Sequence, residues 1–191
     1  MRTKVFEMKK VSGVILAALF LVGVLSLAFN IQQVKAGPTL GMISYWKFDE
    51  NTGRMAFDSV DHNIGTIYGA TWVSGIVNSA LSFDGINDYV KIPDSDNLDI
   101  TGDLTIEAWV NTSQTGLGWI FSNCLEVSPH DGFTLELYNG KARFYSQNSD
   151  LFSASVINTG TWKHIAVTLS GTTATIYVDG VLDSSGTVSY T

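Results

Sequence analysis

The sequence predicts an all-β protein, a sandwich of two antiparallel sheets that starts near residue 37. Short runs alternate between apolar and polar residues with a period of two, and no run after residue 42 keeps the helical period of 3.6. Clusters of Gly, Ser, Thr, Asn and Asp separate these runs, as in chains of many short strands. The chain has 191 residues, of which 45% are apolar, which is enough for one domain with its own core.

Two runs show the alternation most clearly, residues 104–110 and 133–138. In the first, Leu104, Ile106 and Ala108 alternate with Thr105 and Glu107, so that one face is apolar and the other polar. Both runs are therefore expected to be strands that cover a core on one side. Further strands are expected at residues 44–48, 66–68, 80–83, 89–92, 119–122, 142–146, 162–170, 174–178 and 181–184.

Two turns between these strands have a specific signature. Asn139-Gly140 and Asp179-Gly180 each separate two strand-like runs by two residues. Both dipeptides accept the positive φ angles of a type I′ turn, so each predicts a tight hairpin. Strands at such short spacing, joined as antiparallel neighbours, are typical of a sandwich or jelly roll, with almost no helix.

Residues 1–36 predict an export signal. Residues 1–10 are basic, residues 11–29 are uncharged and apolar, and Val34 and Ala36 form a small-residue cleavage site. The apolar run is also long enough to remain as an uncleaved anchor with Lys9 and Lys10 inside, which would be the only contact with a membrane. In both cases residues 37–191 form one outward-facing domain, secreted or held at the cell surface.

Charge and cysteine content exclude several classes. After residue 36 the chain has six basic and seventeen acidic residues, a net charge of −11. Such a surface repels phosphate backbones, and no basic stripe is present, so nucleic acid is excluded as a partner. Cys124 is the only cysteine and cannot form a disulfide within the chain. We therefore expect a domain held together by its core.

Several motifs together resemble one family. They are SYWKFDE at 44–50, FDS at 57–59, ALSFDGINDYVKIP at 80–93, LTIEAWV at 104–110, GTWKHIAVT at 160–168 and IYVDG at 176–180. In this order they are similar to the laminin G-like or pentraxin-like jelly-roll domain of the concanavalin A-like lectin/glucanase superfamily. The resemblance implies a concanavalin A-like sandwich of two antiparallel sheets, with a role in adhesion or glycan binding.

The resemblance also implies that the domain is incomplete at its C-terminus. Members normally continue well beyond the hairpin that corresponds to Asp179-Gly180, and a last strand then lies beside the first one, residues 45–48 here. On this basis we expect the first strand to lack that partner and to leave a sheet edge open.

The sequence does not predict an enzyme. Glycoside hydrolysis needs two carboxylates at a fixed separation, and the glucanase-like spacings E-x-D-x-E and E-x-D-x-x-E are absent, as is G-x-S-x-G. We expect a non-catalytic module that binds an extracellular glycan or glycoprotein. Two alternatives stay open: a part of a secreted polysaccharide-degrading enzyme whose catalytic region is missing, or a structural cell-surface domain.

Oxygen-rich loops make calcium a candidate cofactor. Asp84, Asn87 and Asp88 offer three oxygen side chains around a glycine turn, and resemblance to the pentraxins adds Asp131. The alternative is that these residues only cap their own turns.

Aromatic residues are the candidate glycan contacts, because exposed rings stack on sugars. Trp46 and Trp162 are expected in the core, whereas the rings expected to face outward are Trp109, Trp119, Tyr138, Tyr145 and Phe152. Trp109 is also a candidate for the core. Asn111 begins an N-glycosylation sequon, Asn111-Thr112-Ser113.

Overall fold

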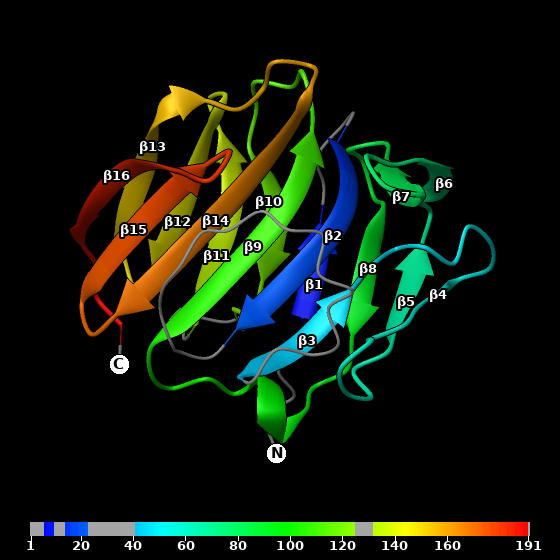
Figure 1. Ribbon diagram of the computed structural model, residues 1–191, viewed down its shortest axis with the longest axis horizontal. Coiled ribbons are helices and arrows are strands. Elements are labelled where there is room, and N and C mark those ends of the chain that lie inside the picture. The colour runs from blue at the N-terminus through cyan, green and yellow to red at the C-terminus, as the bar shows by residue number, and fades with distance from the viewer. Residues whose placement is uncertain (1–5, 10–13, 23–40, 125–131, 191) are drawn as a thin grey trace.

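The computed structural model describes residues 6–9, 14–22, 41–124 and 132–190, and it is a sandwich of two layers (Figure 1). All ladders between its strands are antiparallel. Within the described residues the only helical element is a short 3-10 turn, η1 (Asp96–Leu98). The predicted all-β sandwich is therefore confirmed.

The front layer in Figure 1 is one eight-stranded sheet. Its strand order is β16 (Val181–Thr187), β15 (Thr173–Val178), β14 (Trp162–Ser170), β9 (Leu104–Asn111), β2 (Val14–Val22), β7 (Ser79–Phe83) and β6 (Thr71–Ser74), and β3 (Met42–Trp46) pairs with β2 off this path. The centre of the sheet thus combines strands from both ends of the chain.

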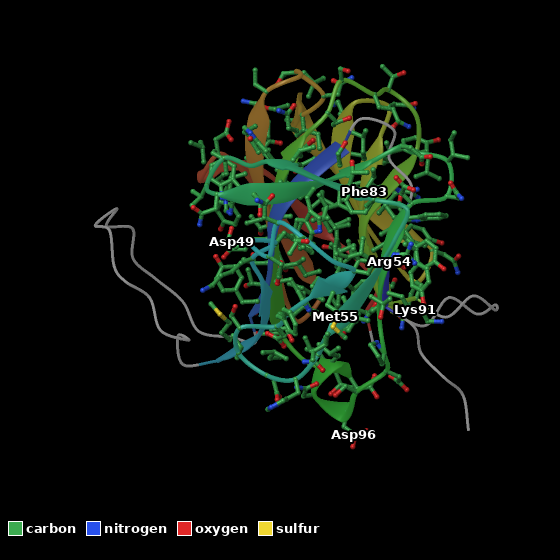
Figure 2. All side chains as sticks on the ribbon, turned by 90° about the vertical axis from the view of Figure 1, so that its right-hand side faces the viewer. Asp49, Arg54, Met55, Phe83, Lys91 and Asp96 are labelled. Atoms are coloured by element: carbon green, nitrogen blue, oxygen red, sulfur yellow. The ribbon has the colours of Figure 1, made fainter. Side chains whose placement is uncertain are left out.

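The back layer contains two four-stranded sheets. One has the order β10 (Gly118–Ser122), β11 (Phe133–Tyr138), β12 (Lys141–Ser146) and β13 (Ser149–Val156), and the other the order β1 (Phe6–Lys9), β8 (Tyr89–Ile92), β5 (Gly65–Tyr68) and β4 (Met55–Ala56). β1 lies against β10, so the two sheets form one continuous layer. Figure 2 looks onto the β4 to β8 end of the sandwich, where Arg54, Met55 and Lys91 lie.

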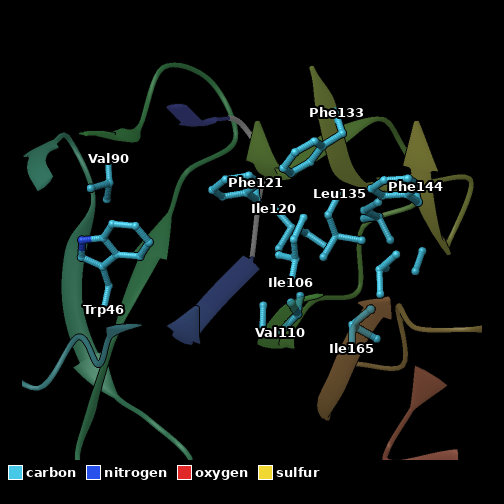
Figure 3. Packing of buried hydrophobic residues seen from close by; sticks show 14 of the residues in the cluster. Trp46, Val90, Ile106, Val110, Ile120, Phe121, Phe133, Leu135, Phe144 and Ile165 are labelled. Atoms are coloured by element: carbon cyan, nitrogen blue, oxygen red, sulfur yellow. The ribbon is translucent and has the colours of Figure 1, made fainter. Parts of the chain in front are cut away.

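The core fills the space between the layers. In β9 every second residue, from Leu104 to Val110, is buried, as the alternation predicted. Phe121, Phe133 and Phe144 from the back layer are fully buried opposite Ile106 and Ile165 from the front layer (Figure 3). Trp46 is also fully buried, and its indole N–H donates to the Asn63 carbonyl at 2.6 Å, which satisfies the ring's polar atom. The expected core position of Trp46 is confirmed.

The two predicted hairpins are present. Asn139 and Gly140 have φ angles of 51° and 80°, and Asp179 and Gly180 have 52° and 77°. Positive φ at both central residues is the type I′ geometry, whose twist matches that of the flanking strands. A third two-residue turn, Gln147-Asn148, also has two positive φ angles, and its sequence lacks the glycine that would have predicted it.

The expected core position of Trp162 is wrong. The register places Trp162 opposite Asn111, so its ring lies on the outer face of the front sheet, half-buried, with His164 and Trp109. The core positions of β14 are instead Ile165, Val167 and Leu169. The large ring of Trp162 suggested an inward position, but the alternation of β14 places this residue on the outer face.

The N-terminal segment contributes two strands. β1 pairs with β8, while β2 pairs with β9, β3 and β7. β2 is thus a ladder partner of β3, the first strand of the predicted domain. Sequence analysis had expected this partner position to be empty. The assignment of residues 1–36 as an export signal stays a prediction. Among the described residues, none belongs to a helix of sufficient length and apolarity to cross a bilayer.

Candidate functional site

The outer face of the β10 to β13 sheet brings together most of the predicted aromatic contacts. A two-residue turn places Tyr138 opposite Lys141, and therefore Glu136 opposite Arg143. The register continues on both sides, to Trp119 on β10 and Phe152 on β13. We call this set the Arg143 cluster; it consists of Trp119, Thr134, Glu136, Tyr138, Arg143, Tyr145, Asp150 and Phe152.

The Arg143 guanidinium is the centre of the cluster. Its carbon lies 5.2 Å from the centre of the Tyr138 ring, 4.6 Å from that of Tyr145 and 5.6 Å from that of Phe152. These distances are typical of cation–π contacts, so the guanidinium holds all three rings on one face. The Tyr138 and Phe152 rings also contact each other, with centres 5.9 Å apart.

Two carboxylates of unequal exposure bind the same guanidinium. Nη1 of Arg143 lies 3.2 Å from Oε2 of Glu136, whose side chain is 6% exposed, and Nη2 lies 3.0 Å from Oδ2 of Asp150, which is 40% exposed. Glu136 also accepts hydrogen bonds from the Trp119 indole N–H at 3.2 Å and from the Thr134 hydroxyl at 2.6 Å. The buried charge is thereby paired and fully hydrogen-bonded, as such a charge must be.

One donor of the cluster is left over. Nε of Arg143 is buried and has no hydrogen-bond partner within the described part of the chain. Tyr138 is 36% exposed at the edge of the cluster. The arrangement offers fixed ring faces and carboxylate and guanidinium groups side by side, which is the chemistry that sugar hydroxyls and sugar rings bind.

Trp109 does not belong to this cluster. It lies on the outer face of the front sheet, where its ring is 5.1 Å from that of His164, and Nε2 of His164 lies 3.4 Å from Oε2 of Glu107. The structure therefore brings together Trp119, Tyr138 and Tyr145, and places Trp109 on the other layer.

Sequence reasoning missed the charged centre of the site, Glu136 and Arg143. A usable signal was present for both. Once Asn139-Gly140 is accepted as a two-residue hairpin, counting back from the turn places Glu136 opposite Arg143. Phe152 was expected as a candidate ring, although β13, the strand that carries it, was not predicted.

The loop proposed for calcium closes on itself. Oδ1 of Asp84 accepts from the backbone N–H groups of Ile86 at 2.7 Å and Asn87 at 3.3 Å, and Oδ2 of Asp88 accepts from the N–H of Asp84 at 2.8 Å. This is a self-capped turn between β7 and β8. Asp131 lies outside the described residues, among which no group of three His, Cys, Asp or Glu side chains is placed to hold a metal ion. Calcium binding stays a prediction.

The sequon lies at the end of a central strand. Asn111 is the last residue of β9 and is half-buried opposite Trp162. Thr112 is buried, and its hydroxyl accepts from the N–H of Gln114 at 3.1 Å. Modification of Asn111 stays a prediction.

Residues 84–191 match the sequence model of the concanavalin A-like lectin/glucanases superfamily, in its laminin G form. The chain belongs to this superfamily. This laminin G-like domain is 31% identical over 87 residues to the rat sushi, von Willebrand factor type A, EGF and pentraxin domain-containing protein 1. The alignment covers 44% of the chain and only 2% of that relative's length.

Among solved structures, the domain is similar to residues 221–444 of an S-layer domain-containing protein from Clostridium thermocellum. The two are 28% identical, the match covers 75% of this chain and 71% of the other, and the TM-score is 0.46.

Proposed function

We propose that this laminin G-like domain is an extracellular, non-catalytic module that binds a neutral glycan through the Arg143 cluster. The observation that carries the proposal is the gathering of Tyr138, Tyr145 and Phe152 around one guanidinium on an outward face. Rings held in this way lose little freedom on binding, so that stacking energy is not spent on ordering them. The apolar segment at residues 11–29 supports export.

The charge of the domain supports a neutral ligand. Residues 37–191 carry a net charge of −11, and the one guanidinium of the cluster already has two carboxylate partners. A sulfated or uronic-acid polysaccharide would therefore meet repulsion that its contacts with Arg143 do not offset. Neutral hexose polymers meet no such barrier.

A glycan array followed by calorimetry on the full chain tests the proposal. Tyr138→Ala is expected to weaken binding about 5-fold, the loss of roughly 1 kcal/mol of stacking. Trp109→Ala is the matched control, because it removes an aromatic ring from the other layer. Weaker binding by the Trp109 variant alone would show that the site is elsewhere, and no bound glycan on the array would contradict the proposal.

Absence of turnover is tested separately. Glu136 is committed to Arg143, Trp119 and Thr134, so it has no free oxygen to move a proton or attack a sugar. We expect no release of reducing ends from neutral β-glucans and galactans by the full chain. Measurable release would favour the alternative of a polysaccharide-degrading enzyme.

A further inference from the structure

At the centre of the front sheet, β2 alone among the described strands connects β9 with β3 and β7. We call the space that it fills the gap. β9 pairs with β14 on one side and with β2 on the other, while β3 and β7 both pair with β2 and not with β9 (Figure 1). Opposite residues include Leu19 with Ala108, Leu19 with Trp46 and Leu16 with Leu81. Without β2, one long edge of β9 and the facing edges of β3 and β7 would lose their ladder partners.

The neighbours of this gap require an apolar strand. Ile106, Ala108 and Val110 of β9 are fully buried on one side, and Trp46 of β3 and Leu81 of β7 are fully buried on the other. Backbone N–H and C=O groups at such a depth need partners, since water cannot reach them. A strand placed there must supply hydrogen bonds along its whole length and be apolar on the face that meets the core.

The segment Val14–Val22 meets both requirements. Its sequence, VILAALFLV, is an unbroken apolar run without charge or proline, which is typical of a fully buried strand. It is joined to β3 through 19 intervening residues, 23–41, and this long connection imposes no tight-turn geometry on the pair. Its place in the sheet therefore rests on its own pairing and not on the connection.

We propose that the gap between β9 and the β3 and β7 strands is a strand-acceptor site, and that Val14–Val22 occupies it as a separable strand. It is held by ladder hydrogen bonds on both of its edges, as in strand addition to a sheet edge. It therefore remains bound when the chain is cut after Ala36, at the predicted signal cleavage position.

Disulfide trapping in the full chain tests the occupancy. With Cys124→Ser as background, Leu19→Cys together with Ala108→Cys is expected to cross-link on mild oxidation, because directly opposite residues lie within disulfide reach. Leu19→Cys with Ile165→Cys is the matched control, since Ile165 is the partner of Ala108 on the far side of β9. Thr105→Cys with Thr168→Cys reports that the sheet is folded. Equal trapping of both Leu19 pairs, or trapping only at Thr105, would overturn the proposal.

Cutting the chain tests separability. With a protease site inserted after Ala36, the N-terminal fragment is expected to co-elute with the domain on a native column and to be released by denaturant. Leu16→Pro is expected to reduce this retention several-fold, because proline removes a ladder donor between β7 and β9. The proposal would be overturned if, after cleavage, the fragment without the Leu16→Pro substitution eluted apart from the domain.

Discussion

The two ion pairs of Arg143 differ in solvent exposure, which determines how much each contributes to stability. Glu136 and Asp150 bind the same guanidinium at similar distances, but the first side chain is 6% exposed and the second is 40% exposed. Removing one partner of a buried pair leaves an uncompensated charge, whereas a solvated pair contributes little. The two carboxylates therefore form a natural matched comparison.

We expect Glu136→Leu to lower the free energy of unfolding by about 3 kcal/mol, because Arg143, Trp119 and Thr134 all lose their acceptor. Asp150→Ala should cost less than about 1 kcal/mol. Urea unfolding of both full-chain variants measures the difference. Equal losses would show that the cluster is open to water.

Asp179 gives a pH prediction. Partial burial raises its pKa, but the hydrogen bonds from Lys163 and from the His164 backbone N–H outweigh this, so that the pKa lies below its ordinary value of 3.8. A depressed carboxyl pKa stabilises the fold above the unfolded value, and the stabilisation is lost as the pH falls through the folded value. It is present at pH 7.

Asp179→Asn keeps a residue that tolerates positive φ and removes the charge. We expect a loss of no more than about 1 kcal/mol at pH 7. The loss should shrink as the pH falls below 3.8 and vanish below the lower pKa of the folded wild-type carboxyl. Thermal unfolding of both proteins across this pH range measures it, and a difference that grows in acid would contradict the assignment.

At the scale of elements, the type I′ turns set the register of the back layer. Gly140 has a φ of 80°, and a Cβ there would lie 2.8 Å from Oδ1 of Asn158. Gly53 has almost the same φ, 78°, with no atom within 4 Å. A pair of alanine substitutions thus separates backbone strain from steric contact.

We expect Gly53→Ala to cost about 1 kcal/mol, the strain of positive φ alone. Gly140→Ala should cost more, because the Asn158 side chain must also move. Chemical denaturation measures both. A larger loss at Gly53 would mean that the turn at Gly140 relaxes freely.

Strands with two unlike faces were predictable from the sequence, whereas three of the edge strands, β4, β6 and β13, were not. β9 buries every second residue, and β11 alternates apolar core residues with Thr134 and Glu136, so the period of both is visible in the letters alone. β13 buries only Ser153 fully, and that hydroxyl accepts from the N–H of Ala142 at 2.9 Å, so no apolar period marks the strand. β4 has only two residues, and β6 lies at a sheet edge.

The aromatic residues of the candidate site were predictable from the sequence, but the Glu136–Arg143 pair at its centre was not. Trp119, Tyr138 and Tyr145 carry an aromatic signal that is visible in sequence. Glu136 and Arg143 act through a cross-strand contact, which exists only once the register is known. Trp162 was misassigned because bulk suggested burial, whereas the register of β14 turns it outward.

At the scale of the whole molecule, the Asp183 carboxylate connects the two layers where their edge strands β13 and β16 lie side by side. Asp183 on β16 accepts hydrogen bonds from the backbone N–H groups of Ala154 and Ser155 on β13. β13 and β16 are the edge strands of their sheets, so Asp183 both satisfies free donors and places a charge at the edge. It therefore protects the sandwich against pairing with another copy.

We expect Asp183→Ala to aggregate faster on heating, with a clear rise in light scattering. Asp103→Ala is the control, because it removes the same charge from a carboxylate that binds Ser170 and Gly171 within the front layer. Equal aggregation of the two variants would show that charge alone, and not edge protection, is responsible.

The pairing of β2 with β9 also means that β2 is synthesised well before its partner strand. Leu19 pairs with Ala108, about 90 residues further along the chain. A ribosome adds roughly 5–20 residues per second, so β2 waits about 4–18 seconds before β9 has been made. During that interval the apolar segment has no completed sheet to enter and is open to capture by any export machinery that binds such segments. If the segment also serves as the predicted signal, its capture therefore has to take place within this interval.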